Sequence, residues 1–458
     1  MFDDTIAAIA TPLGEGGLAL IRISGPQALA VADQSFAPVG KSSLKPSIAP
    51  THTIHFGHIV RDAQIIDEVL VAVLRAPRTF TREDVVEITC HGGILPAKMV
   101  LDTVLAQGAR LAEPGEFTRR AFLNGRIDLA QAEAVADIIH SRTELALTAA
   151  NEQLAGKLSQ RINQLRDDLL KTLAHVEAYI DFPEEDIPEE TMGQLLARLE
   201  GGMAFMDELL RTANEGQILR RGIRAAIIGR PNAGKSSLLN QLLGHDRAIV
   251  SPIAGTTRDT IEETANIRGL PVVFIDTAGL REGRDEIEVE GIRRSRDVLG
   301  KAEFILHVMD ASEPLTEADQ KYLTELAAKK SIIVRNKTDL PGKLELPVAS
   351  NTAPRMVDVC CLSGKGIEQL KDAVKELVWA GDIKTEMLQV MINSRHQDAL
   401  NRARAAAQLS VASLQAGETL ELAAMDLRIA VNAVGEIVGK TTNEDLLDLI
   451  FSQFCIGK

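Results

Sequence analysis

Short apolar runs separated by turn residues occupy the first 122 residues of the chain. Four of these runs have the length and composition of β-strands, at residues 5–10, 18–24, 69–74 and 85–90. Glycines at positions 14, 16 and 17 predict a hairpin turn between the first two strands. Residues 94–106 have helical spacing, with proline tolerated in the first turn, and the polar residues 78–84 predict a loop. This pattern predicts a small α+β domain with one helix.

From residue 123 the apolar positions take on helical spacing. They recur every three or four residues from Leu154 to Ile180, which predicts one long amphipathic helix. Two prolines and several carboxylates at 181–190 predict a break between helices, and a solvated acidic loop is favoured there over a metal site. Helical spacing returns at residues 387–450. Because such helices need partners for their apolar faces, the two flanks predict one helical domain with the intervening segment inserted into it.

The inserted segment begins with a strand, a glycine loop and a helix. Residues 225–228 predict a buried strand, and the leucines at 238, 239 and 242 predict the inner face of a helix. Between them Gly229, Gly234, Lys235 and Ser236 have the spacing of a P-loop. In such a loop backbone N–H groups surround phosphates, the lysine reaches the β- and γ-phosphates and the serine ligates Mg²⁺. The alternative, a glycine turn that happens to precede a lysine, leaves the flanking strand and helix unexplained.

Three further signatures follow in the order found in guanine-nucleotide-binding proteins. Residues 255–259 form a switch-like loop with threonine hydroxyls, and the strand 272–275 leads to Asp276 and Gly279, which suit a Mg²⁺ shell and a γ-phosphate. The strand 332–334 leads to Asn336-Lys337-Thr338-Asp339. The Asp339 carboxylate can accept hydrogen bonds from N1–H and the exocyclic amine of guanine, whereas adenine would leave it unpaired. GTP is therefore predicted over ATP.

Composition limits the class of protein. The 458 residues suffice for about three domains, and 45% apolar and 25% charged residues are typical of a soluble protein. No run approaches the roughly 20 apolar residues of a membrane span, and the N-terminus lacks a basic signal-peptide region, so a cytoplasmic protein without membrane association is expected. The four cysteines have neither metal-ligand spacing nor a disulfide pattern. A net charge of −14 argues against a general nucleic-acid coat. For the basic cluster Arg220, Arg221 and Arg224 a solvated linker is favoured over RNA docking.

Five motifs give the chain a resemblance to a known family. They are Gly-Arg-Pro-Asn-Ala-Gly-Lys-Ser-Ser (229–237), Ile-Ala-Gly-Thr-Thr-Arg-Asp (253–259), Asp-Thr-Ala-Gly-Leu-Arg (276–281), Pro-Gly-Glu-Phe-Thr-Arg-Arg-Ala-Phe-Leu-Asn-Gly (114–125) and Phe-Cys-Ile-Gly-Lys (454–458). Over essentially its whole length the chain resembles the MnmE (TrmE) family of tRNA-modification GTPases, in the TrmE–Era–Era-like-septation superfamily. The last two motifs are the most specific, because unrelated GTPases lack them.

The resemblance implies a multidomain plan. Residues 1–122 would be an α+β domain that binds tetrahydrofolate and dimerises, and 123–216 the first part of a discontinuous α-helical domain. Residues 217–383 would be an inserted α/β P-loop (Ras-like) G domain. Residues 384–458 would complete the helical domain and carry the C-terminal Cys-x-Gly-Lys motif.

The resemblance also assigns ligands in the G domain. The implied GTP-binding residues are Asn232, Ala233, Gly234, Lys235, Ser236, Ser237, Ser251, Thr256, Thr257, Asp276, Gly279, Asn336, Lys337, Asp339, Cys360, Cys361 and Leu362. Mg²⁺ would be held by Ser236 and Thr257. K⁺ would be held by Asn232, Ser251, the Ile253 backbone and Thr256.

The implied catalytic groups differ from those of most small GTPases. Leu280 occupies the place of the usual glutamine and cannot orient the attacking water. The resemblance gives that role to Glu288, with Lys235 on the phosphates; from the residues alone, Glu288 is a surface glutamate in the acidic run 285–290. K⁺ would supply the positive charge otherwise given by an arginine finger. The 251–256 loop would be ordered when two G domains meet.

The G domain departs from the family pattern in two places. Cys360, Cys361 and Leu362 stand at a Ser-Ala-Lys motif on the guanine side, so weaker nucleotide affinity is expected without loss of specificity. Ser251 replaces a threonine, which is a mild change for an oxygen ligand.

The resemblance places a folate site in the N-terminal domain. The matching positions are Arg22, Glu87, Arg126 and Lys458, and the ligand would be 5,10-methylenetetrahydrofolate, with 5-formyltetrahydrofolate as an analogue. A carboxylate can accept from the pterin's amino–amide edge, and cations suit the glutamate tail. Cys455 is either a catalytic group near the folate and the RNA base or a partly buried thiol.

Together these features predict a homodimeric, K⁺-activated GTPase. By resemblance it would act with the flavoprotein MnmG, in a heterotetramer or larger complex, to form 5-carboxymethylaminomethyluridine or aminomethyluridine at the wobble position of tRNA. The alternative is a translation or ribosome-assembly switch GTPase without modification activity. An ATP-dependent P-loop enzyme is disfavoured by Asp339.

Overall fold

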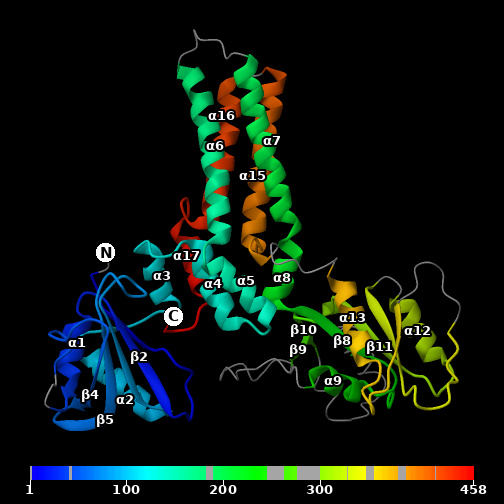
Figure 1. The fold of residues 1–458 in the computed structure, drawn as a ribbon, viewed down its shortest axis with the longest axis horizontal. Helices are drawn as coiled ribbons and strands as arrows, with labels where there is room; N and C mark the ends of the chain where they lie inside the picture. Colours follow the sequence, from blue (N-terminus) through cyan, green and yellow to red (C-terminus); the bar gives the residue numbers. More distant parts are fainter. Residues whose placement is uncertain are drawn as a thin grey trace. The chain divides into compact units, whose positions relative to one another are not determined.

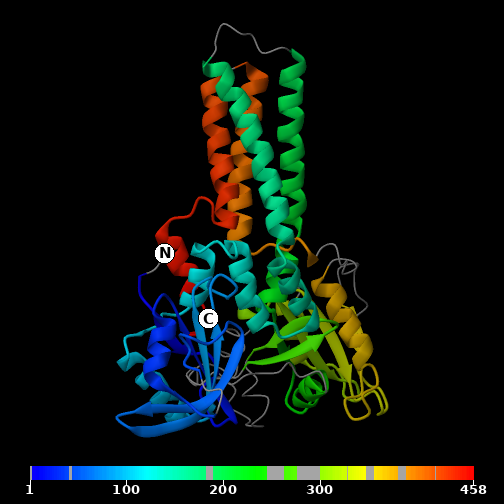
Figure 2. The ribbon, with the colours of Figure 1, turned by 60° about the vertical axis from the view of Figure 1, so that its left-hand side comes forward.

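The computed structural model describes residues 3–40, 44–181, 189–244, 262–275, 300–326, 329–346, 355–379, 388–417 and 419–457. The chain forms two compact units (Figures 1 and 2). Unit 1 contains Met1–Ala136, Ser159–Leu199 and Ala405–Lys458, and unit 2 contains Asp137–Leu158 and Glu200–Arg404. Among the described residues each unit contains one β-sheet, so the protein combines two mixed α/β regions with a set of long helices.

The sheet of unit 1 has seven strands in the order β3-β4-β5-β6-β2-β1-β7. The pairs are antiparallel except for β1 with β7. The strands are β1 Ile6–Ile9, β2 Leu18–Ser24, β3 Phe36–Pro38, β4 Thr53–Arg61, β5 Gln64–Leu74, β6 Val85–His91 and β7 Arg110–Leu111. Alternation along β2 buries Ile21 and Ile23 in a core shared with residues of α1 (Ala28–Ser35) and α2 (Ile94–Ala106). The intervening Arg22 therefore faces the other side of the sheet.

Most of the expected elements of this region are confirmed. β1, β2, β6 and α2 match the predicted runs closely, β5 begins at Gln64, five residues before the predicted run 69–74, and the stretch 78–84 is irregular. The expectation of one helix is wrong, because α1 and α3 (Glu116–Leu123) are also helical and each has only eight residues. β3, β4 and β7 were not predicted, because β3 and β7 have only three and two residues and the histidines and glycine of β4 interrupt its apolar alternation.

Long helices form the rest of unit 1. They include α6 (Lys157–Asp181), α16 (Leu420–Val438) and the parts of α7 (Glu189–Arg211) and α15 (Ser394–Ala416) that fall in this unit, and they run side by side in both views (Figures 1 and 2). The predicted apolar stripe of α6 is buried from Leu158 to Val176. The assignment of Leu154 to this helix is wrong. Leu154 ends a separate helix, α5 (Glu144–Leu154), and Gly156 at φ +84° breaks the path between the two.

Shorter helices connect these elements. They are α4 (Leu129–His140), α8 (Ala213–Arg221) and α17 (Glu444–Phe451). Within unit 1, α17 packs its buried Leu447, Ile450 and Phe451 into a cluster with Leu129 of α4. In the described parts of the chain, no helix is long and apolar enough to cross a membrane.

The sheet of unit 2 has six strands in the order β13-β12-β11-β8-β10-β9. They are β8 Ile223–Ile228, β9 Glu263–Ile267, β10 Leu270–Phe274, β11 Phe304–Asp310, β12 Ser331–Asn336 and β13 Arg355–Asp358. All pairs are parallel except the β9–β10 hairpin. The helices α9 (Lys235–Leu243), α12 (Glu317–Leu326) and α13 (Ile367–Val378) belong to the same unit. Because parallel strands end at one edge of a sheet, the segments after β8, β12 and β13 lie close together, as in other open α/β sheets that bind ligands there.

Candidate functional site

The glycine loop after β8 has the backbone of a phosphate-binding turn. Gly229 has φ +150° and Gly234 has φ +95°, and Asn232 between them has φ +62°. A Cβ on Gly229 would lie 2.2 Å from the Val308 carbonyl oxygen, so only glycine allows the loop to pass this close to β11. α9 begins directly after the loop at Lys235. A helix N-terminus behind a glycine loop favours bound anions.

Lys235 folds back over this loop. Its ammonium Nζ donates to the carbonyl oxygens of Gly229 at 2.9 Å and of Arg230 at 2.8 Å. Ser236 and Ser237 follow it in the first turn of α9. The arrangement therefore gathers a cation, two hydroxyl-bearing residues and a helix N-terminus, which is the chemistry that a nucleoside triphosphate with Mg²⁺ requires.

Asn336 joins the glycine loop to the segment after β13. It is the last residue of β12 and only 2% exposed. Its Nδ2 donates to the Ala233 carbonyl at 3.0 Å, and its Oδ1 accepts from the Cys361 backbone N–H at 3.1 Å. The Asn336 side chain thus connects the glycine loop, where phosphates would bind, to the Cys361 segment, where the base would bind.

Lys337 and Thr338 hold the turn that follows β12. Lys337 has φ +63°, and its ammonium forms a 2.6 Å ion pair with Asp310 at the end of β11. Burial acts to raise the pKa of Asp310, but hydrogen bonds from Lys337 and Ser312 outweigh it and leave the pKa below its usual value. Thr338 donates both its N–H and its hydroxyl to the Val359 carbonyl. These contacts place the exposed Asp339 at the rim of the sheet edge.

The Cys360-Cys361-Leu362 segment lies beside Asp339, as a base-side segment requires. The thiol of Cys360 donates to Oδ1 of Asp339 at 3.2 Å. Cys361 instead packs into the core of unit 2, and burial raises the pKa of its thiol to about 11. Its carbonyl accepts a 2.8 Å hydrogen bond from Gln241 of α9. Leu362 is 90% exposed.

In unit 1, Arg22 and Glu87 form a cross-strand pair. Register places them opposite each other on β2 and β6. Nε and NH2 of Arg22 donate to Oε1 of Glu87 at 2.8 Å and 2.7 Å. NH1 of Arg22 donates to the Gly457 carbonyl at 3.3 Å, and the guanidinium lies 5.7 Å from the Phe117 ring centroid. The structure therefore brings two predicted folate-site residues together with the C-terminal tail.

Arg126 and Cys455 contribute separately to this part of unit 1. The Arg126 guanidinium lies 4.8 Å from the Phe80 ring centroid and donates to the Phe80 carbonyl at 3.1 Å. Burial, followed by the charge of Arg82, lowers the pKa of Arg126 from its usual value. The carbonyl of Cys455 accepts from the Gly115 N–H at 3.4 Å, while Cys455 itself is exposed. The thiol is thus accessible and not partly buried.

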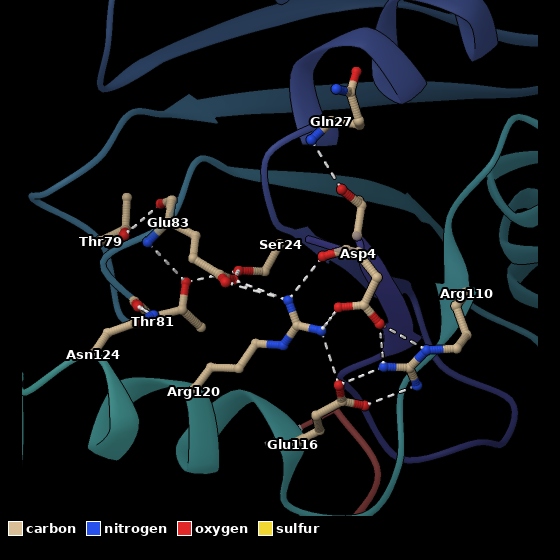
Figure 3. Close-up of polar contacts among 11 residues, drawn as sticks. Asp4, Ser24, Gln27, Thr79, Thr81, Glu83, Arg110, Glu116, Arg120 and Asn124 are labelled. Atoms are coloured by element: carbon tan, nitrogen blue, oxygen red, sulfur yellow. Dashed lines mark hydrogen bonds and ion pairs between the residues drawn. The ribbon is translucent and has the colours of Figure 1, made fainter. Parts of the chain in front are cut away.

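A network around Arg120 was not anticipated from the sequence (Figure 3). Arg120 has no exposed side-chain surface and forms ion pairs with Asp4, Glu83 and Glu116 at 2.7, 3.2 and 2.9 Å. Arg110 also binds Asp4 and Glu116, each at 2.6 Å. The network ties the start of β1, the 79–84 loop and α3 together. It therefore supports Phe80 and Gly115, which contact Arg126 and the C-terminal tail.

The arginines of the basic cluster are paired with acids within unit 2. Arg220 binds Asp137 and Arg221 binds Glu303, both at 2.7 Å. Arg224 lies 3.8 Å from Glu262 and donates its backbone N–H to Glu303. These pairs offset much of the positive charge that an RNA-docking patch would need.

Several predicted site residues fall outside the described residues. They are Ser251, Ile253, Thr256, Thr257, Asp276, Gly279, Glu288 and Lys458.

The fold and the loop geometry define a P-loop nucleotide-binding protein with an additional α+β domain and a set of long helices. The sequence profile of the MnmE helical domain matches residues 129–455, and that of the GTP-binding protein TrmE N-terminus matches residues 5–126. The tRNA modification GTPase MnmE of Geobacillus kaustophilus is 48% identical over 460 residues, 99% of both chains. That of Geobacillus thermodenitrificans is 49% identical over 461 residues, again 99% of both chains. The chain belongs to the MnmE family of tRNA modification GTPases.

Proposed function

We propose that this chain is a GTPase that acts in the modification of the tRNA wobble uridine. The proposal depends most on Asn336, whose side chain hydrogen-bonds both to the P-loop at Ala233 and to the base-side segment at Cys361. Asp339, the residue specific for guanine, follows Asn336 in the same turn. Family membership at 48% identity over 99% of the chain supports the same reaction. Asp339 gives the preference for GTP over ATP, because only guanine offers two donors to one carboxylate.

In the proposed domain plan the G domain spans 217–383 and is inserted into a helical domain formed by 123–216 and 384–458. Residues 1–122 form the folate-binding and dimerisation domain. The adjacency of α6, α7, α15 and α16 supports a helical domain built from both flanks (Figures 1 and 2).

The residues of the P-loop suit two different cations. Oxygen ligands are what Mg²⁺ prefers, and the Ser236 hydroxyl in the first turn of α9 would hold it together with Thr257, with Asp276 acting through water. K⁺ would be held by the Asn232 side chain together with Ser251, Ile253 and Thr256. Bound there, K⁺ would supply positive charge that stabilises the charge developing on the phosphates.

Two side chains of this chain, Lys235 and Glu288, have different roles in the proposed hydrolysis. Lys235 neutralises the phosphates, and its present acceptors, two carbonyls of the loop, are weaker partners than phosphate oxygens. Glu288 orients the attacking water. Hydrolysis would be coupled to the meeting of two G domains, as the family resemblance implies.

The folate site is proposed at Arg22, Glu87, Arg126 and Lys458. The partly buried cross-strand ion pair of Arg22 with Glu87 beside the C-terminal tail supports this location. Glu87 would accept from the pterin edge and the cations would bind the glutamate tail of 5,10-methylenetetrahydrofolate. The exposed Cys455 lies on the same tail and is the proposed thiol near the RNA base.

The complete reaction needs a partner. The proposed complex is a homodimer of this chain with the flavoprotein MnmG, in a heterotetramer or larger assembly in the cytoplasm. It would add a carboxymethylaminomethyl or aminomethyl group at C5 of the uridine, with carbon from the folate and nitrogen from glycine or ammonium. GTP hydrolysis would drive a conformational cycle.

Reconstitution tests this function. Purified chain, MnmG, unmodified tRNA, GTP, K⁺, methylenetetrahydrofolate and glycine are incubated, and the wobble nucleoside is analysed by mass spectrometry. The modified uridine is expected with the wild type and not with Lys235→Ala. GTP hydrolysis without any modified nucleoside or folate binding would instead support a switch GTPase without modification activity.

A further inference from the structure

Cys360 contacts the carboxylate that is proposed to recognise guanine. Its Sγ donates to Oδ1 of Asp339 at 3.2 Å, a normal length for a sulfur donor. Among the residues that the structure describes, no other side chain hydrogen-bonds to this carboxylate. Asp339 itself is exposed, so without the thiol little would restrict its side-chain rotation.

The backbone around Cys360 fixes the direction of the thiol. The N–H of Cys360 donates to the Lys365 carbonyl at 2.8 Å, and the Gly364 N–H donates to the Cys360 carbonyl at 2.9 Å. Gly366 closes the same turn at φ +84°, where a Cβ would lie 2.0 Å from the Asp358 carbonyl oxygen. Cys360 is 3% exposed. The Cys360 backbone is therefore held in a closed, hydrogen-bonded turn, and its buried thiol has the Asp339 carboxylate as acceptor.

The adjacent cysteine has a different environment. The Cys361 side chain belongs to the apolar core of unit 2, and only its backbone serves the site, through Asn336 and Gln241. The two neighbouring thiols thus provide an internal comparison, since one faces the recognition carboxylate and the other does not.

Guanine recognition depends on the orientation of Asp339. Its carboxylate must accept from N1–H and from the exocyclic amine at once, which requires both oxygens in the plane of the base. Each oxygen has two acceptor sites, so Oδ1 can accept from the thiol and from guanine together. We propose that Cys360 is a positioning residue for guanine recognition, whose thiol holds the Asp339 carboxylate in the orientation that accepts both guanine donors. This inference rests on the proposed GTP-binding function.

The test compares two nucleotides that differ only at the exocyclic amine. Dissociation constants for GTP and ITP are measured by fluorescent-nucleotide displacement for the wild type, Cys360→Ala and Cys360→Ser. ITP offers only N1–H to Asp339, so it depends less on the carboxylate's orientation. Cys360→Ala is expected to weaken GTP binding about three- to tenfold, the usual effect of one lost hydrogen bond, and ITP binding by a smaller factor. Cys360→Ser keeps a donor and is expected to bind GTP at least as tightly as the wild type.

Cys361→Ala is the matched control. It removes a thiol from the core, so it is expected to lower thermal stability while leaving the ratio of GTP to ITP affinity unchanged.

The possible outcomes distinguish the positioning role of Cys360 from the proposed GTP binding itself. Equal effects of Cys360→Ala on GTP and ITP, or no effect on either, would overturn the positioning role while leaving GTP binding by the wild type intact. Failure of the wild type to bind GTP would overturn the proposed function and the positioning role together.

Discussion

At the scale of single residues, Asn336 is the most constrained side chain of the nucleotide site. It satisfies the Ala233 carbonyl and the Cys361 N–H, and a Cβ on Gly234 would lie 2.1 Å from its Nδ2. The sequence motif identified Asn336 as a nucleotide residue, but a motif does not show which backbone groups a side chain joins. The role of Asn336 as a link between two loops became visible only in the structure.

Asn336→Ala is predicted to impair both stability and GTP binding. It leaves one buried donor and one buried acceptor unsatisfied, which costs about 1–3 kcal/mol each. Urea unfolding and GTP titration measure the two effects. Asn266→Ala is the control, because Asn266 caps the β9–β10 turn with one bond to Gly269 and should lower stability without changing GTP affinity. Unchanged GTP affinity in Asn336→Ala would contradict the linking role.

The sequence could not reveal the partners of Arg120 or Cys360. Asp4 and Glu83 lie 116 and 37 residues from Arg120, and Asp339 lies 21 residues from Cys360. Side-chain pairs at such separations are set by tertiary packing and leave no periodic signal. By contrast, Arg22 and Glu87 were placed in one site by family resemblance, and their cross-strand register supports that placement.

At the scale of elements, long and strongly patterned segments were predictable. α2, β2 and the apolar stripe of α6 follow their sequence patterns closely. The break at Gly156 was missed because apolar spacing continues across it, although glycine reaches φ +84° more readily than other residues. Short helices such as α1 have too few turns to show a clear periodicity of apolar residues in the sequence, and they are stabilised by tertiary packing.

The Arg120 network is predicted to be a major stabiliser of unit 1. Arg120→Met would leave Glu83 and Glu116 as buried carboxylates without this cation, and such a loss typically costs about 3–5 kcal/mol. Chemical unfolding followed by circular dichroism measures the effect. Arg428→Met is the matched control, since the Arg428–Glu177 pair on the long helices is largely exposed and should contribute less than about 1 kcal/mol. Equal effects of the two changes would argue against the network's importance.

The same network predicts a loss of stability in acid. Burial acts to raise the pKa of Asp4 and of Glu116, but hydrogen bonds from Arg110, together with those from Arg120, outweigh it and leave both pKa values below their usual values. Because the unfolded state then binds more protons, the stabilisation is complete above the unfolded pKa values and is lost as the pH falls through the folded ones. Urea midpoints from about pH 6 down to about pH 3 should fall, and Glu116→Gln should make that fall shallower. An unchanged slope in Glu116→Gln would show that Glu116 does not contribute.

At the scale of the whole molecule, the two ends of the chain meet within unit 1. Arg22 contacts Gly457 across a separation of 435 residues. Gly457 has φ +91°, and a Cβ there would lie 2.5 Å from the Ile9 carbonyl oxygen. The C-terminal tail is therefore fitted closely against β1, and the proposed folate site depends on both ends of the chain.

Gly457→Ala is predicted to weaken tetrahydrofolate binding while GTP binding stays unchanged. The added methyl group would displace the tail from β1 and from Arg22. Calorimetric titration with 5-formyltetrahydrofolate measures the change. Gly417→Ala is the control, since Gly417 has a similar φ of +68° but no atom within 4 Å of the added Cβ. Normal folate binding by Gly457→Ala would show that the C-terminal tail does not contribute to the folate site.

We propose that this chain hydrolyses GTP with the help of a monovalent cation, and the dependence of its GTPase rate on the cation tests this proposal. The GTPase rate of the purified protein is compared in K⁺ and Na⁺ at equal ionic strength, for the wild type and Asn232→Gly. Glycine tolerates the φ of +62° at this position and removes only the side-chain ligand. We expect K⁺ to stimulate the wild type strongly and this stimulation to be lost in Asn232→Gly. Equal wild-type rates in the two salts would contradict it.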